Sequence, residues 1–160
     1  MSQPTYKDAQ GREWFPRLDF ARLRAIRDQT GVDLGLAEQM GREWAKLVID
    51  DGKTIRALWI ASDNGISVED FEAGLDGESI DNGVNALKEA IVNFTRPLKR
   101  GMVRQAIDAL MEGYQAAIAE GEKQIQSLMQ QGTTRAMDSV RGMPPQTVPA
   151  SLDISTSIGL

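Results

Sequence analysis

Hydrophobic and polar positions along this chain recur mostly at helical spacing. Between Glu78 and Phe94, apolar residues follow one another at steps of four, three, four and three, which is the strongest periodicity in the sequence. These residues are Ile80, Val84, Leu87, Ile91 and Phe94. The pattern predicts an amphipathic helix with one face toward a core.

A helix is also predicted directly after Asp19. Phe20, Leu23 and Ile26 form one apolar edge, and Asp19 is a suitable N-cap. Gly31 is a suitable residue for the C-terminal stop.

Two helices should follow, over residues 36–50 and 53–61. The first carries a broad apolar stripe, formed by Leu36, Met40, Trp44, Leu47 and Val48. We expect Asp51–Gly52 to break the chain between the two helices, and Ile55, Leu58 and Trp59 to point inward from the second.

Ser67 and Asp70 resemble a capping box that opens a further helix. That helix carries Phe71 and Leu75 and is expected to stop at Gly77. Near the N-terminus, turn residues 8–11 separate residues 5–7 from 12–15, so a short β-hairpin is predicted there.

Pro97 is well placed to begin a last, long helix. If continuous to Gln131, this helix would span about 50 Å at 1.5 Å per residue. Gly113 and Gly121 should weaken it. One helical stripe can hold its apolar residues, which are Leu98, Met102, Val103, Ile107, Leu110, Met111, Tyr114, Ile118, Ile125, Leu128 and Met129.

Two uses of that stripe are open: packing on the other helices, or binding a partner. We expect Leu98 to Leu110 to pack on the other helices. Beyond Tyr114 we expect partner binding or self-association, because the preceding helices are too short to cover the whole length. The candidate partner-binding residues are Met111, Tyr114, Ile118, Ile125, Leu128 and Met129.

The patterns together predict an all-α fold: a small helical bundle with a short N-terminal β-hairpin, a long C-terminal helix and a disordered tail. The expected divisions are a flexible start over 1–10, a helical core over 11–96, the long helix over 97–141 and the tail over 142–160. The tail is predicted to be disordered from its Pro, Ser and Thr content.

Composition narrows the chemistry. The 160 residues include no histidine and no cysteine, so common catalytic triads, zinc sites and thiol chemistry are excluded. The net charge of −5 disfavours general binding of nucleic acid. The lack of cysteine fits the cytoplasm, and neither a signal peptide nor a membrane span is recognisable.

No cofactor or metal site is predicted. The acidic residues between Asp63 and Asp81 fit no calcium-loop register, so they are interpreted as helix-start carboxylates that face water. No glycine-rich nucleotide loop is present, and Asp50–Asp51 is interpreted as a helix-end feature. Three tryptophans are interpreted as core anchors: Trp14, Trp44 and Trp59.

Basic residues gather in two regions. One comprises Arg96, Lys99, Arg100 and Arg104, and the other comprises Arg12, Arg17, Arg22, Arg24 and Arg27. Either region could contact phosphate. The favoured interpretation is that both are solvated faces that pair with the acidic segment between Asp63 and Asp81 or with an acidic partner.

Several segments resemble one family. Residues 11–20, 23–26 and 30–34 are similar to the opening of tail assembly chaperones from long-tailed bacteriophages and prophages. The resemblance continues in residues 66–71 and 86–91, and covers about residues 5 to 110.

The resemblance implies a small, mostly helical protein without catalytic residues. Such a protein binds the tape measure protein, helps to recruit tail tube subunits in the host cytoplasm, and is absent from the mature virion. The alternative from another class is a small acidic regulator or adaptor that contacts nucleic acid or protein through its arginine-rich faces. An enzyme using carboxylate or lysine chemistry is the third reading.

Overall fold

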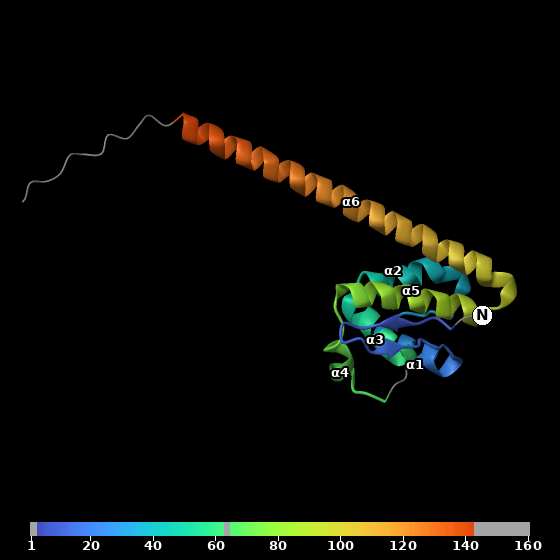
Figure 1. The fold of residues 1–160 in the computed structure, drawn as a ribbon. Coiled ribbons are helices and arrows are strands. Elements are labelled where there is room, and N and C mark those ends of the chain that lie inside the picture. The colour runs from blue at the N-terminus through green and yellow to red at the C-terminus, as the bar shows by residue number, and fades with distance from the viewer. Residues whose placement is uncertain (1–2, 63–64, 143–160) are drawn as a thin grey trace, which may run out of the picture. The chain divides into compact units, whose positions relative to one another are not determined.

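The computed structural model describes residues 3–62 and 65–142, apart from the side chains of 136–140. It confirms a mostly α-helical fold with an N-terminal β-hairpin and a long C-terminal helix (Figure 1). The elements are β1 Tyr6–Lys7, β2 Glu13–Trp14, α1 Phe20–Thr30, the 3-10 turn η1 Ala37–Gln39, α2 Met40–Val48, α3 Asp51–Ser62, α4 Val68–Glu72, α5 Gly77–Phe94 and α6 Pro97–Arg141. The predicted tail lies outside the described residues from position 143 on.

Helix α3 is the centre of the bundle, because it contacts α1, α2, α4 and α5. It buries Ala57, Leu58 and Ala61 completely. Helix α5 crosses α3 so closely that a Cβ atom on Gly83 would lie 2.8 Å from Cδ1 of Leu58. A side chain at this position would therefore force Leu58, which is fully buried, to shift.

The three tryptophans anchor the core, as predicted. Trp44 is fully buried and Trp14 is nearly so. Trp59 is partly buried and donates a hydrogen bond from Nε1 to the carbonyl oxygen of Ile66 over 3.0 Å.

The predicted hairpin is present, with Tyr6 paired to Trp14 and Lys7 to Glu13. Both aromatic residues point into the core, and the Trp14 ring meets Phe71 of α4 edge-on at 5.2 Å. The turn is tied to the segment that follows α4, because the Ala9 amide donates to the carbonyl oxygen of Gly74 over 2.9 Å.

The predicted ends of α1 are confirmed. Asp19 Oδ1 accepts from the Arg22 amide over 2.8 Å, and Gly31 ends the helix at a φ of 72°. Phe20 is a correction, because the residue is 77% exposed, although its ring lies 5.1 Å from that of Phe94 in an edge-to-face arrangement. At 100° per residue Phe20 lies about 120° from Ile26 around the helix, so it falls at the margin of the buried face.

The chain from 36 to 62 differs from the prediction in its boundaries. The expected helix over 36–50 is the short turn η1 followed by α2, and α3 begins at Asp51 where a break was predicted. The reason is that Asp50 Oδ1 accepts from the Lys53 amide over 3.1 Å and so caps α3. Gly52 consequently lies in the first turn of a helix.

Ser67 caps α4 as expected, since its Oγ accepts from the Asp70 amide over 3.1 Å. The helix ends at Glu72, earlier than predicted. The reciprocal capping box belongs to the next helix, where Asp76 and Ser79 bond to each other's backbone amides.

Helix α6 is continuous from Pro97 to Arg141. Its first turns are part of the core, because Val103 and Ile107 are fully buried. Leu98 is a second correction, since it is fully exposed rather than packed. Nine residues separate Leu98 from Ile107, so the two side chains lie about 180° apart around the helix.

Two ion-pair contacts join α5 to this part of α6. Arg104 donates to both carboxylate oxygens of Glu89 over 2.7 and 2.8 Å, and Lys88 Nζ lies 3.1 Å from Asp108 Oδ1.

Contacts divide the chain into two compact units, one up to Gln115 and one from Ala116 on. Among the described residues, no helix has the length and apolar character needed to cross a membrane.

Candidate functional site

A row of large apolar side chains lies exposed along α6 after the core ends. Tyr114 and Ile118 are 41% and 46% exposed, and the exposed fraction reaches 59–68% in the residues that follow, Ile125, Leu128 and Met129. At 100° per residue all five fall within a sector of about 100° around the helix. We call these five residues the α6 stripe.

The stripe continues the buried face of the same helix. Ile107 lies in the same sector and is fully buried, and Leu110 and Met111 are partly buried against the core. Met111 therefore contributes to the core, and the exposed surface begins at Tyr114. The other five predicted partner-binding residues all lie on the α6 stripe.

A heptad phase underlies the stripe. Tyr114, Ile118, Ile125 and Leu128 occupy alternating a and d positions with a period of 3.5 residues. The same phase places Gly121 and Gly132 at the remaining a and d positions between 114 and 132. We call these six residues the α6 seam. Helix propensity alone indicates only that the two glycines weaken the helix. The heptad phase is the signal that assigns them to the apolar face.

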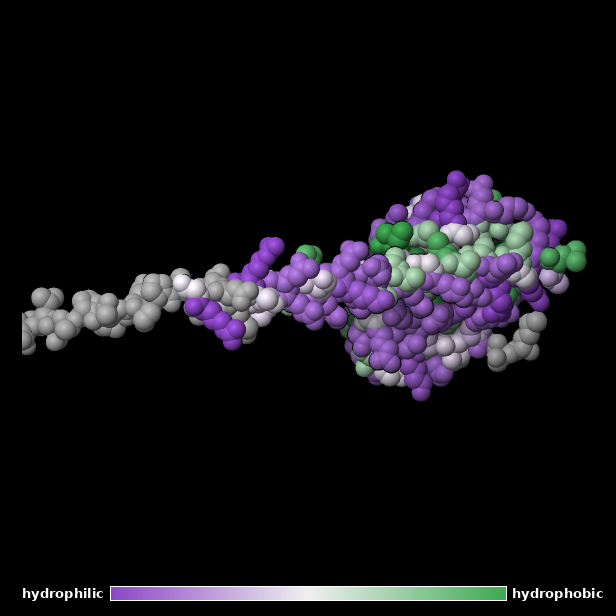
Figure 2. Space-filling model, turned by 90° about the horizontal axis from the view of Figure 1, so that it is seen from above, coloured by the Kyte–Doolittle hydropathy of each residue, from purple (hydrophilic) through white to green (hydrophobic). Residues whose placement is uncertain are grey.

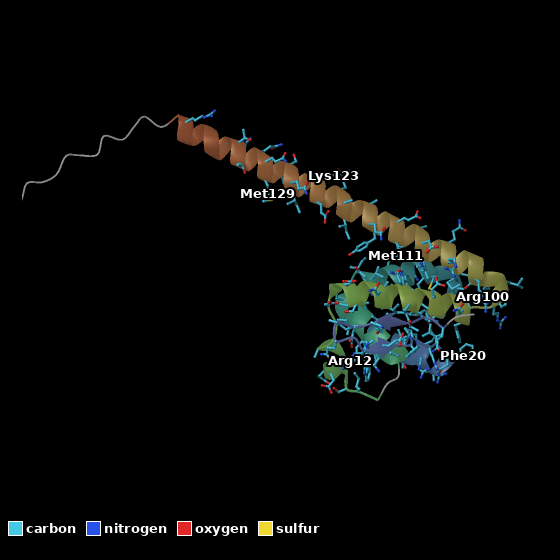
Figure 3. The ribbon with its side chains drawn as sticks, in the orientation of Figure 1. Arg12, Phe20, Arg100, Met111, Lys123 and Met129 are labelled. Carbon is cyan, nitrogen blue, oxygen red and sulfur yellow. The ribbon has the colours of Figure 1, made fainter. Side chains whose placement is uncertain are left out.

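Apart from Gly121 and three alanines (Ala116, Ala117 and Ala119), polar residues occupy the rest of α6 between Tyr114 and Gln131. The face that Figure 2 shows is mainly hydrophilic along the helix. Lys123 and Met129, labelled in Figure 3, are six residues apart and thus lie about 120° apart around the axis. An apolar face that is exposed on a helix with a polar back is typical of a surface that binds another helix.

Several of the basic residues engage acidic groups and carbonyl oxygens of the chain itself. Arg104 bonds to Glu89, Lys99 bonds to Glu38, and Arg12 Nε donates to Asp8 Oδ2 over 2.6 Å. Arg100 donates to the carbonyl oxygens of Thr95 and Asn93, both over 2.9 Å. The carboxylates in these contacts belong to Asp8, Glu38 and Glu89, so they lie outside the acidic segment between Asp63 and Asp81 that was expected to pair with the basic residues.

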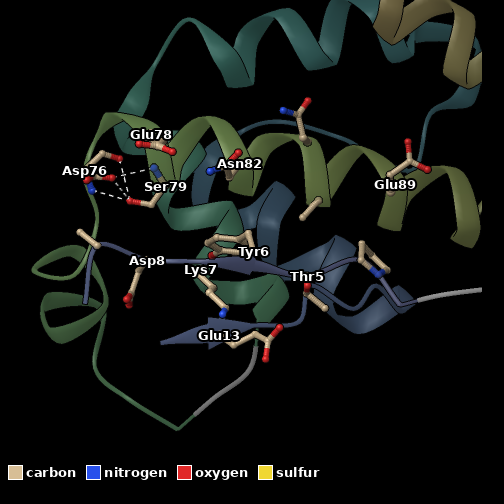
Figure 4. A pocket seen from close by; sticks show the side chains of 14 residues that line it. Thr5, Tyr6, Lys7, Asp8, Glu13, Asp76, Glu78, Ser79, Asn82 and Glu89 are labelled. Atoms are coloured by element: carbon tan, nitrogen blue, oxygen red, sulfur yellow. Dashed lines mark hydrogen bonds between the residues drawn. The ribbon is translucent and has the colours of Figure 1, made fainter. Parts of the chain in front are cut away.

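An open furrow of about 670 Å³ runs between the hairpin and α5 (Figure 4). Its lining includes Lys7 and Glu13 from the hairpin and Asp76, Asn82 and Glu89 from the α5 side. Sequence reasoning did not single out this furrow, because its residues come from segments about seventy positions apart.

Several ionisable groups of the furrow have shifted pKa values. Hydrogen bonds from Ser79 lower the pKa of Asp76, and the Arg104 side chain lowers the pKa of Glu89. Burial raises the pKa of Tyr6 to about 12. General acid–base catalysis works best with a pKa near the operating pH, and these shifts all lead away from neutrality.

Within the described part of the chain, no three Asp or Glu side chains converge in a way that could hold a metal ion. The acidic residues expected to lie near helix starts include Glu69, Asp70 and Glu78, which fall in the first turns of α4 and α5. The α6 stripe is therefore the strongest candidate for a functional surface.

Comparison of the chain with protein-family models, with curated proteins and with solved structures gives no match.

Proposed function

We propose that this protein is a non-enzymatic tail assembly chaperone of a long-tailed phage or prophage, and that it binds the tape measure protein through the α6 stripe. The observation that carries the proposal is the one-sided row of exposed apolar side chains from Tyr114 to Met129. The identity of the partner rests on the sequence resemblance in residues 11–34, 66–71 and 86–91.

The chemistry of the stripe suits such a partner. A tape measure protein is long, helical and apolar, and would aggregate if its apolar faces stayed bare. A helix with an exposed apolar face can cover a partner helix by inserting side chains between those of the partner. Met129 adds adaptability, since an unbranched thioether fits varied partner surfaces.

The acidic regulator that contacts nucleic acid has less support. Its contacts would need the basic regions, and Arg12, Lys99 and Arg104 each pair with a carboxylate of the chain. The enzyme reading has less support too, because the pKa values of Tyr6, Asp76 and Glu89 in the furrow are shifted away from neutrality.

The test is co-expression with the tape measure protein encoded at the same locus, followed by size exclusion with light scattering. We expect a soluble complex, and an insoluble tape measure protein when it is expressed alone. A tape measure protein that precipitates in both cases, leaving this chain free in solution, would overturn the proposal.

Variants locate the binding surface. Leu128→Asp puts a charge into the stripe and should abolish the complex, because an unpaired buried carboxylate is strongly unfavourable. Ser127→Asp adds the same charge one residue earlier, on the polar side of α6, and should leave the complex intact. Equal effects of the two substitutions would show that binding lies elsewhere.

The proposal also fixes where and when the protein acts. It would work in the cytoplasm of the bacterial host, possess an affinity for tail tube subunits, and leave before the virion is complete. Mass spectrometry of purified virions should therefore detect tube and tape measure proteins without this chain.

A further inference from the structure

We infer that the furrow between the hairpin and α5 binds an extended, basic peptide segment, which pairs with the free edge of β1 as a third strand. The furrow is lined by residues 4–9, by Glu13 and by residues 76–89. This binding is therefore independent of the α6 stripe and of the proposed function.

One edge of β1 is unpaired. The Asp8 amide donates to the carbonyl oxygen of Arg12 over 3.0 Å, so it points toward the second strand of the hairpin. Successive residues of a strand direct their backbone groups to opposite edges, so the amide and carbonyl of Lys7 point away from β2. Within the described residues, no hydrogen bond reaches either of these two groups of Lys7. An edge of this kind can accept a further strand.

The free edge of β1 opens into the furrow. The Ala9 amide, two residues after Lys7, donates to the carbonyl oxygen of Gly74 over 2.9 Å, shortly before α5 begins at Gly77. From there the furrow runs along the chain from Ala9 back to Thr5, with one flank of α5 as its other wall (Figure 4). The position that a third strand would occupy beside Lys7 is therefore open.

The length of the furrow suits a short extended segment. The stretch from Thr5 to Ala9 spans about 13 Å at 3.3 Å per residue. On the other wall, the part of α5 from Glu78 to Glu89 spans about 16 Å at 1.5 Å per residue. An extended peptide of about four or five residues covers this distance.

The α5 wall can hydrogen-bond to such a segment. Asn82 and Asn85 both line the furrow and are exposed, and they lie three residues apart on one face of the helix. An asparagine amide offers both donors and an acceptor, as a peptide backbone or a polar side chain requires. Ala86, the neighbouring lining residue, leaves room for the segment because its side chain is a single methyl group.

The charge of the lining favours a basic ligand. Glu13 and Glu78 are exposed, and neither forms an ion pair with another described residue. Hydrogen bonds from Ser79 lower the pKa of Asp76, so this carboxylate is also charged at neutral pH. Among the described residues that line the furrow, Lys7 is the single cation. The furrow should therefore attract a lysine or arginine of the ligand and repel an acidic segment.

Nuclear magnetic resonance titration of the full chain tests the inference. The probe is a capped pentapeptide that alternates valine with lysine, and the matched peptide carries glutamate in place of lysine. We expect the amide signals of Thr5 and Lys7 to shift, with a Kd roughly tenfold or more lower for the lysine peptide. Unmoved signals at millimolar concentrations of the lysine peptide would overturn the inference. Equal Kd values for the two peptides would overturn the preference for a basic ligand.

Variants at Lys7 separate the backbone contact from the side chain. Lys7→Pro removes the amide that would donate to the peptide, at an edge position that tolerates proline, and should raise the Kd roughly tenfold or more. Lys7→Ala keeps the amide and removes the cation, so it should bind the lysine peptide at least as tightly as the wild type does. A Kd that Lys7→Pro leaves unchanged would overturn the strand pairing.

The wild-type chain tests the same contact if Lys7→Pro disturbs the hairpin. A lysine peptide whose backbone nitrogens are methylated keeps its charge and loses its donors, so its Kd should also rise roughly tenfold or more. An unchanged Kd for the methylated peptide would show that the peptide does not bind as a strand.

Carboxylate variants test the charge of the furrow. Glu78→Gln should raise the Kd of the lysine peptide about two- to fivefold, as expected for one exposed charge pair. Glu72→Gln removes an exposed carboxylate of α4 that does not line the furrow, and should leave the Kd unchanged. Equal effects of the two substitutions would place the bound peptide elsewhere on the molecule.

Discussion

Asp8 joins the hairpin turn, the hairpin strand and the core through one buried carboxylate. Its Oδ1 accepts from the amides of Gln10 and Arg12, both over 2.9 Å, and its Oδ2 accepts from Arg12 Nε and Trp14 Nε1 over 2.6 and 3.0 Å. Burial acts to raise the pKa of Asp8, but the hydrogen bonds from Arg12 and Trp14 outweigh it and lower that pKa below its ordinary value.

Asp8→Asn should destabilise the fold by about 1–3 kcal/mol, because an amide nitrogen faces donors where the carboxylate accepted hydrogen bonds. Chemical unfolding at neutral pH, followed by tryptophan fluorescence, measures the change. Glu120→Gln, an exposed position on α6, is the control and should leave the free energy of unfolding unchanged.

The same carboxylates predict how stability depends on pH. The pKa of Glu43 is lowered by hydrogen bonds from Lys46 and the Asp33 amide, as that of Asp8 is by its partners. A pKa lowered by folding adds stability that is complete above the unfolded value of about 4 and is lost as the pH falls through the folded value. We expect the free energy of unfolding to drop below about pH 4.

In Glu43→Gln, the free energy of unfolding should fall less between neutral and acid pH than it does in the wild type. An unchanged slope between neutral and acid pH would mean that Glu43 contributes nothing to it. Unfolding in denaturant at a series of pH values gives both slopes.

At the scale of the element, the same substitution should have opposite effects in two helices. Gly121→Ala in α6 adds a methyl group with no atom of the chain within 4 Å, so it should stabilise the helix by about 1 kcal/mol. Gly83→Ala in α5 places its Cβ 2.8 Å from buried Leu58 and 3.3 Å from Tyr6, so overpacking should cost about 1–3 kcal/mol.

Hydrogen exchange of residues 113–132 reports the first effect and thermal unfolding the second. Gly113→Ala is a matched control in α6, since its Cβ also meets no atom of the chain and lies outside the seam. Faster exchange in Gly121→Ala than in the wild type would contradict the expected gain.

Local signals predicted the elements well where one residue decides the outcome. Asp19, Gly31 and Ser67 act where their capping chemistry placed them, and the spacing of Val84, Leu87 and Ile91 gave the buried face of α5. The start of α3 was not predicted correctly, because the Asp50 side chain caps the N-terminus of α3, whereas the sequence pattern placed Asp50 at the end of the preceding helix.

Exposure was harder to predict than helicity. Phe20 and Leu98 are apolar residues in helices, yet they lie outside the buried faces, since apolar character alone does not fix the angle around the axis. The furrow could not be predicted, because local patterns do not tell which helix the hairpin will meet. For the α6 stripe, the sequence supplied five residues, and the burial of Met111 set its boundary.

At the scale of the whole molecule, the core ends well before α6 does. Among the described residues, every member of the hydrophobic core and its partly buried neighbours lies between Tyr6 and Met111. A chain truncated after Gln115 should therefore unfold cooperatively, with a Tm within about 4 °C of the full-length value, the shift that corresponds to about 1 kcal/mol or less.

Truncation after Phe94 is the contrasting variant. It removes Val103 and Ile107, which are fully buried, and should leave no cooperative transition in calorimetry. A full-length Tm in that variant, or an unfolded chain after truncation at Gln115, would place the boundary of the core elsewhere.

The hairpin meets its partners late in synthesis. Its hydrogen bonds reach across the chain to Asp70, Ala73 and Gly74, and the core closes only with Ile107 of α6. A ribosome adds about 5–20 residues per second, so roughly 5–20 s separate the addition of Tyr6 from that of Ile107. During that interval Tyr6 and Trp14 have no finished core to enter. Growing chains of this protein should therefore depend on factors that shelter nascent aromatic segments until α6 has begun.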